Sequence, residues 1–173
     1  MPDANDRVMI YTDGACSPNP GPGGYGVILD RAGMRREFSG GFRKTTNNRM
    51  EMIAAIEGIK ALPEGEQPEV TILSDSRYLV DMFNGGYARQ WRANSWQLAS
   101  RKRAVNTDLW SALLDLVGDR PIRFEWVRGH SEHPENERCD ALAVAARQGE
   151  ALPPDEGYEA ACRAAPQQLG LFE

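Results

Sequence analysis

Residues 11–29, YTDGACSPNPGPGGYGVIL, bring an apolar run to an end at Asp13, pass through glycines and prolines, and resume as a second apolar run. The residues at 19–23 are typical of a tight connection between two antiparallel strands. Gly21–Gly26 also matches the G-x-G-x-x-G pattern of dinucleotide-binding folds, but that pattern requires a helix directly after the glycines, and a strand-like run follows here. We therefore interpret the stretch as a hairpin that leaves Asp13 at a strand end.

The rest of the chain alternates between strand-like and helix-like patterns. Strands expected at 7–12, 24–29 and 35–42 are joined by short turns, which predicts an antiparallel meander. A helical pattern over 48–62 separates the meander from a buried-type strand at 70–74, which can therefore lie parallel to the first strand in a mixed sheet. Further along we expect helices at 76–83, in the segment after it, at 108–117 and at 134–147, and a fifth strand at 123–127.

Length and composition are typical of one soluble α/β domain. The chain has 173 residues, and its three cysteines, Cys16, Cys139 and Cys162, are far apart with no C-x-x-C pair. No segment resembles a signal peptide or a membrane span. We expect a cytoplasmic monomer that does not bind membranes, with a catalytic domain at 1–149 and a mobile acidic tail at 150–173.

Charge is distributed unevenly along the chain. The formal net charge is −5, yet the segment 84–106 contains no acidic residue and carries five basic ones, interleaved with Tyr87, Trp91 and Trp96. Basic and aromatic side chains together are typical of a nucleic-acid-binding surface. A solvated helix with aromatic anchors in the core would have the same composition. Both interpretations stay open at this point.

Four carboxylates stand out because they lack obvious partners. Glu51 and Asp140 lie on predicted helices with no basic residue three or four positions away, although Asn48 could form a capping box with Glu51 and Asp140 could be a solvated flank. Asp13 and Asp75 follow apolar strands, and Asp75 could also be an N-cap. If the fold brings the four together, cations must hold them, and hard oxygen ligands suit Mg²⁺. Such a site can cleave phosphodiesters with two metal ions.

A glycine-containing loop precedes the last predicted helix. His130 in this loop could transfer protons. Alternatively, His130, His133 and Cys139 could form a zinc site, although one short cluster is weak support for it.

Four motifs resemble the bacterial type 1 ribonuclease H family: YTDG at 11–14, TTNNRME at 45–51, SDS at 74–76 and GHSEHPENERCD at 129–140. The resemblance covers roughly residues 7 to 147 in the order and spacing of the family. It implies a ribonuclease H-like five-stranded mixed sheet, three antiparallel strands followed by parallel strands, with helices on both faces. The implied activity is endonucleolytic cleavage of the RNA strand of RNA–DNA hybrids, leaving 5′-phosphate and 3′-hydroxyl ends.

The resemblance also implies roles for individual residues. Asp13 would bridge two Mg²⁺ ions, for which Mn²⁺ could substitute, with Asp140 at the water-activating site and Glu51 and Asp75 at the leaving-group site. His130 would assist proton transfer or product release. The implied hybrid-binding residues are Cys16, Asn19, Asn47 and Asn48 in the minor groove, Lys44, Thr46 and Asn106 at a phosphate of the DNA strand, and Tyr87, Trp91 and Trp96 on a basic protrusion.

Two positions depart from the family pattern. Lys44 replaces a frequent Arg, which keeps the charge and loses the bidentate fork. Arg77 stands where a Gln often reads the minor groove, and an Arg there can still donate hydrogen bonds.

The chain ends in a second, separate motif. Gln168, Leu169, Gly170, Leu171 and Phe172 resemble the pentapeptide by which bacterial replication and repair proteins dock on the sliding clamp, with Gly at the position usually taken by Ser or Asp. An unused apolar tail end is the alternative. For the chain as a whole, a transposase-like nuclease core or a non-catalytic hybrid-binding adaptor is the rival to the ribonuclease, and the complete set of acids argues against the adaptor.

Overall fold

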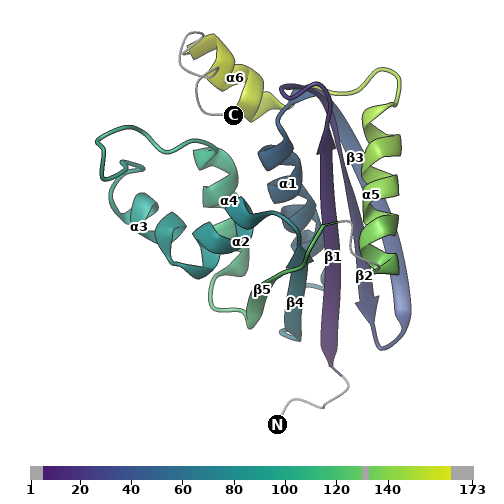
Figure 1. Cartoon of the computed structure of the whole chain (residues 1–173). Helices are drawn as coiled ribbons and strands as arrows, with labels where there is room; N and C mark the ends of the chain where they lie inside the picture. The colour runs from purple at the N-terminus through teal and green to yellow at the C-terminus, as the bar shows by residue number, and fades with distance from the viewer. Residues whose placement is uncertain (1–5, 130–132, 165–173) are drawn as a thin grey trace.

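The computed structural model describes residues 6–129 and 133–164, and it contains a five-stranded sheet in the order β3-β2-β1-β4-β5 (Figure 1). The antiparallel half confirms the predicted meander, and β4 and β5 run parallel to β1. The strands are β1 (Arg7–Cys16), β2 (Gly21–Arg31), β3 (Met34–Thr45), β4 (Glu69–Ser74) and β5 (Ile122–Trp126).

Helices cover both faces of the sheet. Gly58 in α1 packs on the Ile10 and Val27 side chains, so α1 lies on the face to which Val27 points. The neighbouring residue Gly26 points to the opposite face, where its Cα approaches the backbone of Cys139 in α5. The helices are α1 (Asn47–Lys60), α2 (Arg77–Asn84), α3 (Tyr87–Ala93), α4 (Thr107–Val117), α5 (Pro134–Arg147) and α6 (Glu156–Ala164).

The glycine-rich stretch belongs to strand β2, which begins at Gly21 rather than at residue 24. A Cβ atom on Gly24 or Gly26 would collide with the backbone carbonyl of Ala143 or Cys139 in α5. Glycine therefore allows the helix to approach the sheet closely, and only 17–20 form the connection. Because a strand and no helix follows the glycines, the dinucleotide-binding interpretation is excluded.

The basic segment forms a helix over only part of its length. It contains the seven-residue α3 and then an irregular loop with one bridge between Gln97 and Arg103. The ring of Trp91 packs edge-on against Trp110 of α4, with 6.2 Å between the ring centroids, and Trp110 is completely buried. The segment is thus anchored to the core by an aromatic contact.

The C-terminal segment up to residue 164, which was expected from the sequence to belong to a tail, contains a helix and packs against the rest of the domain. The backbone N–H of Arg43 in β3 donates to the carbonyl of Pro153, and α6 follows directly. Asp155 and Tyr158 are buried, at 4% exposure each. Prolines and acids in this stretch predicted mobility, whereas its packing partners lie more than 100 residues earlier in the chain.

The length and hydropathy of each helix show whether it could span a membrane. Within 6–129 and 133–164, no helix is both long and apolar enough to cross a bilayer.

Candidate active site

Asp13 lies within β1, opposite Gly26 of β2, and its side chain is buried with 6% exposure. One of its carboxylate oxygens accepts a hydrogen bond from the N–H of Gly14 at 2.8 Å. A Cβ on Gly14 would lie only 2.7 Å from the backbone N of Glu51, so the glycine lets the first turns of α1 pack against β1. This close approach is what brings Glu51 to Asp13.

Glu51 is not part of a capping box. Thr46 caps α1, and its hydroxyl accepts from the N–H of Arg49 at 3.2 Å. Glu51 is 3% exposed, and among the described residues its Oε2 atom is the buried side-chain oxygen or nitrogen that has no hydrogen-bond partner. A buried carboxylate oxygen left unpaired is costly unless a ligand occupies the space beside it.

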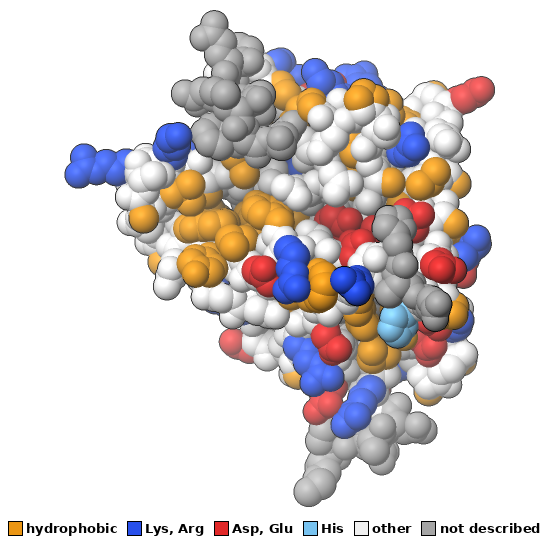
Figure 2. Space-filling view, in the orientation of Figure 1, with side chains coloured by type: hydrophobic (Ala, Val, Ile, Leu, Met, Phe, Trp, Pro, Cys, Tyr) orange, Lys and Arg blue, Asp and Glu red, His pale blue; other side chains and the backbone are white. Residues whose placement is uncertain are grey.

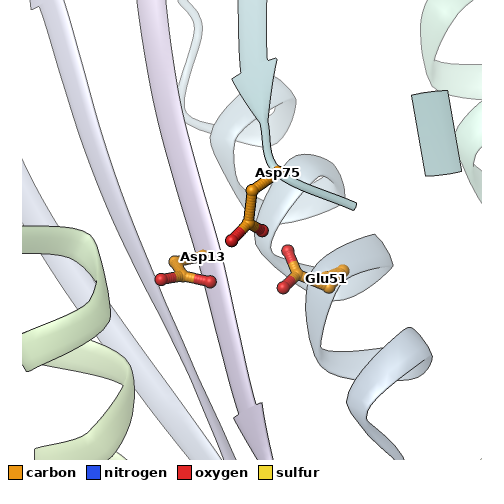
Figure 3. Close-up of side chains that lie close together, drawn as sticks. All are labelled: Asp13, Glu51 and Asp75. Atoms are coloured by element: carbon orange, nitrogen blue, oxygen red, sulfur yellow. The ribbon is translucent and has the colours of Figure 1, made fainter. Parts of the chain in front are cut away.

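Asp75 follows β4 and precedes α2, but it is not the helix cap. Ser76 has that role, because its hydroxyl accepts from the N–H of Leu79 at 3.2 Å. The backbone carbonyl of Asp75 accepts from the indole N–H of Trp126 at 3.0 Å, which attaches this turn to β5. The Asp75 side chain points toward Asp13 and Glu51 (Figure 3).

Three of the four predicted carboxylates therefore converge. Within the described residues, Asp13, Glu51 and Asp75 each offer an oxygen, and these oxygens lie within 4.8 Å of one another. Asp140 is on α5, half-buried, and lines the same cleft of about 520 Å³ without joining this close group. Acidic side chains gather near the centre of the face shown in Figure 2.

Burial and mutual repulsion raise the pKa values of the clustered carboxylates. Burial, followed by the charge of Asp75, raises the pKa of Asp13 to about 7. Burial, followed by the charge of Asp13, raises the pKa of Glu51 well above its usual range. Asp140 adds to the shift at Asp13. Oxygen donors that repel one another, with one buried oxygen unpaired, fit a hard divalent cation.

The zinc alternative fits poorly. The thiol of buried Cys139 donates to the carbonyl of Tyr11 at 3.4 Å, and burial raises the Cys139 pKa to about 12, so it is not a ready thiolate ligand. His133 is exposed at the N-cap of α5. His130 lies outside the described residues, and its predicted role stays a prediction.

Several predicted substrate-binding residues lie at the cleft. Asn47, Asn48 and Arg77 line it. Asn19 is exposed and accepts from the N–H of Asn47 at 3.1 Å, which places the 17–20 connection beside the start of α1. The Cys16 thiol donates to carbonyls of the same region. The residues predicted to bind the minor groove are thus grouped around the start of α1.

The residues predicted to bind the DNA strand differ from one another in exposure and in their contacts. Lys44 is exposed, whereas Thr46 is buried and uses its hydroxyl to cap α1. Asn106 adopts a left-handed conformation and donates to the Tyr78 hydroxyl at 3.3 Å. Tyr87 is 49% exposed, but Trp91 and Trp96 pack against the core, which favours the anchor interpretation for these two rings.

Two features of the cleft were missed by the sequence reasoning. The guanidinium of Arg77 stacks on the ring of Trp126 with 3.5 Å to the ring centroid, so a residue of β5 orients the charge at the cleft. Asn136 is buried and lines the cleft one turn before Asp140. No sequence signal pairs Arg77 with Trp126, whereas Asn136 is visible in the sequence as a neighbour of Asp140 on one helix face, and that spacing could have suggested a place at the cleft.

Comparisons with known proteins agree with this geometry. The family model described as RNase H matches residues 5–148. A Ribonuclease H of Rippkaea orientalis is 54% identical over 159 residues, covering 92% of this chain and 96% of the relative, and one of Trichodesmium erythraeum is 51% identical, covering 92% and 100%. The structure is similar to that of LC9-RNase H1, a type 1 RNase H with the type 2 active-site motif (TM-score 0.74, 31% identity, 90% of this chain and 80% of that one).

A second solved structure, LC11-RNase H1 in complex with RNA/DNA hybrid, matches with a TM-score of 0.62 and 26% identity, covering 80% of this chain and 95% of that one. The fold, the carboxylate cluster and these matches lead to one conclusion. The chain belongs to the ribonuclease H family of hydrolytic nucleases.

Proposed function

We propose that this enzyme hydrolyses the RNA strand of RNA–DNA hybrids with two Mg²⁺ ions, leaving 5′-phosphate and 3′-hydroxyl ends. The observation that carries the proposal is the convergence of Asp13, Glu51 and Asp75 around a buried, unpartnered Glu51 oxygen in a ribonuclease H fold. The hybrid complex of the similar LC11-RNase H1 supports the choice of substrate.

The residues that would hold the ions are Asp13, Glu51, Asp75 and Asp140. Asp13 would serve both ions, Asp140 would serve the activation of water, and Glu51 and Asp75 would serve the stabilisation of the leaving oxygen. When bound, the ions activate water and stabilise the leaving oxygen. Mn²⁺ could substitute for Mg²⁺, because both accept oxygen ligands. His130 would assist proton transfer or product release.

The chain itself would recognise the hybrid through the cleft. Asn47 and Asn48 line it, and amide groups can donate to or accept from a 2′-hydroxyl in the wide minor groove. Arg77, held flat on Trp126, presents a cation at the same cleft. Lys44 and the exposed Tyr87 would contact the DNA strand.

The test is cleavage of an end-labelled RNA–DNA hybrid in Mg²⁺, beside duplex DNA and duplex RNA of the same sequence. We expect only the RNA of the hybrid to be cut, because duplex DNA lacks the 2′-hydroxyl and duplex RNA presents a different second strand. Binding of the hybrid without Mg²⁺-dependent cleavage would instead support the adaptor function.

We further propose that the protein is a cytoplasmic monomer whose C-terminal residues, Gln168, Leu169, Leu171 and Phe172, bind the replication sliding clamp. These residues lie outside the described part of the chain. The resemblance of their pattern to clamp-binding peptides supports the proposal, since two Leu and a Phe can fill an apolar groove.

Deleting residues 168–173 is expected to abolish clamp binding, measured by calorimetry, while hybrid cleavage keeps its wild-type rate. The reason is that the deletion removes the tether and none of the residues at the cleft. Equal clamp affinity with and without these residues would refute the tether.

A further inference from the structure

Arg49 is a buried cation that joins three separate parts of the chain. It lies in the first turn of α1 and is 3% exposed. On one side its guanidinium donates to both carboxylate oxygens of Asp155, at 2.7 and 2.9 Å. On the other side it donates to both oxygens of Asp108 in α4, at 2.8 and 2.7 Å. The C-terminal segment is therefore bonded directly to the helix that carries Glu51.

Asp155 also contacts the residues that lead into α1. Its Oδ2 accepts from the hydroxyl of Thr45 at 2.7 Å, and Thr45 immediately precedes the α1 cap, Thr46. Its Oδ1 accepts from the N–H of Tyr158, which lies in the first turn of α6. One buried carboxylate thus holds the end of β3, the start of α1 and α6 in a single arrangement.

The residues held in this arrangement are those that form the cleft. Arg49 follows Asn48 and lies two residues before Glu51, and both of these line the cleft. Glu51 makes no hydrogen bond through its buried Oε2, so local hydrogen bonds leave that oxygen unrestrained. Its position depends on where the first turn of α1 sits, and that turn is held both by its close approach to Gly14 and by the ion pairs of the Arg49 side chain.

We propose that Asp155 is a positioning residue for the divalent-metal site, acting through Arg49 and Thr45 on Glu51. This inference rests on the proposed metal-dependent function. It gives the C-terminal segment a role in catalysis, although the segment lies beyond the residues 5–148 that the family model matches. A Cβ on Gly157 would collide with the Asp108 carboxylate and approach Arg49 to 2.7 Å, so α6 is packed directly on the ion cluster.

A matched control exists in the same helix. Glu159 of α6 pairs with Arg43 of β3 at 3.0 Å, and it contacts neither Arg49 nor Thr45 in the described structure. Glu159→Gln therefore weakens the packing of α6 and leaves the contacts of Asp155 with Arg49 and Thr45 unchanged. Asp155→Asn is the milder test variant, because it keeps the side-chain shape and one acceptor, while Asp155→Ala removes all four hydrogen bonds.

The experiment measures two quantities: the Mg²⁺ affinity by calorimetry without substrate, and kcat and KM for hybrid cleavage. Both are measured on full-length variants at a temperature where circular dichroism shows every variant to be folded. We expect Asp155→Ala to weaken Mg²⁺ binding about fivefold or more and to lower kcat, Asp155→Asn to have a smaller effect in the same direction, and Glu159→Gln to stay within about twofold of wild type. If Asp155→Ala does not fold, the Mg²⁺ affinity and kcat of Asp155→Asn alone test the proposal.

Two outcomes would contradict the proposal, and they are distinguishable. If the Asp155 variants lose only thermal stability and bind Mg²⁺ as wild type does, Asp155 is structural and the proposed function is unaffected. If wild type itself neither binds Mg²⁺ nor cleaves the hybrid, the proposed function is wrong and this inference is wrong with it.

Discussion

Replacing Asp13 with Asn is expected to lower the rate of hybrid cleavage about a thousandfold or more while hybrid binding stays within a few-fold of wild type. Asp13 is a buried carboxylate close to both Glu51 and Asp75, and an amide cannot supply its negative charge to a cation. Losing several kcal/mol of metal-dependent stabilisation of the transition state corresponds to this factor, since each 1.36 kcal/mol is tenfold. Single-turnover cleavage and a filter-binding titration would measure the two effects.

Asp119→Asn is the matched control for this substitution. Asp119 is exposed between α4 and β5 and lies outside the residues that line the cleft, so the same chemical change there should leave the cleavage rate unchanged. Retention of more than about a tenth of wild-type activity by Asp13→Asn would contradict the assignment of Asp13 as a metal ligand, given that a central ligand is worth several kcal/mol.

Without divalent metal, the protein is expected to lose stability as the pH rises from about 5 to 8. The pKa of Asp13 is 3.8 when unperturbed and about 7 in the folded protein, and the pKa of Glu51 shifts in the same direction. An acid whose pKa is raised by folding binds more protons in the folded state, so its contribution is complete below the unfolded pKa and is lost as the pH rises through the folded one. The shift at Asp13 alone corresponds to about 2–3 kcal/mol over this range.

Urea unfolding in a chelator at pH 5 and pH 8 would measure this effect. The lowered pKa values of Glu37 and Asp108 act in the opposite sense, but they act as the pH falls through and below the unperturbed values of 4.5 and 3.8, so they do not offset the change between pH 5 and pH 8. Asp13→Asn should reduce the pH dependence by removing one of the two titrating groups. Adding Mg²⁺ to the wild type should stabilise it more at pH 8 than at pH 5, because metal competes with protons for the carboxylates. A flat pH profile in the chelator would refute the raised pKa values of Asp13 and Glu51.

Three of the four carboxylates that the sequence singles out converge in the structure, whereas several strand boundaries differ from the predicted ones. Glu51 could be singled out because no basic residue lies within a helical turn of it, and the structure confirms that it is buried beside Asp13 and Asp75. The competing local roles, a capping box for Glu51 and an N-cap for Asp75, could be excluded only after Thr46 and Ser76 were seen to cap α1 and α2. Two neighbouring polar residues can have nearly equal propensity to cap a helix. Only the backbone conformation in the folded protein shows which of them is the cap.

The start of β2 and the C-terminal segment could not be predicted, and the reason is the same for both. Residues 21–23 looked like part of the turn, but they belong to β2, and Gly24 and Gly26 of the same strand are glycines because α5, more than 100 residues later, packs against them. Asp155 looked like part of an acidic tail, but its partners are Thr45 and Arg49. In each case the residue is explained by a contact with a segment that is distant along the chain, and the local sequence does not reveal that contact.

By itself, the sequence determined the order of strands and helices up to residue 147, the antiparallel meander with a parallel extension, and the four carboxylates, because these follow from local periodicity, turn chemistry and the absence of nearby partners. The tertiary structure alone decided that Asp140 lies at the edge of the close group, that Trp91 is a core anchor, and that residues 150–164 are bonded to the helix of Glu51. Local propensity is a property of neighbouring residues, whereas burial and ion pairing depend on which surfaces the folded chain brings into contact.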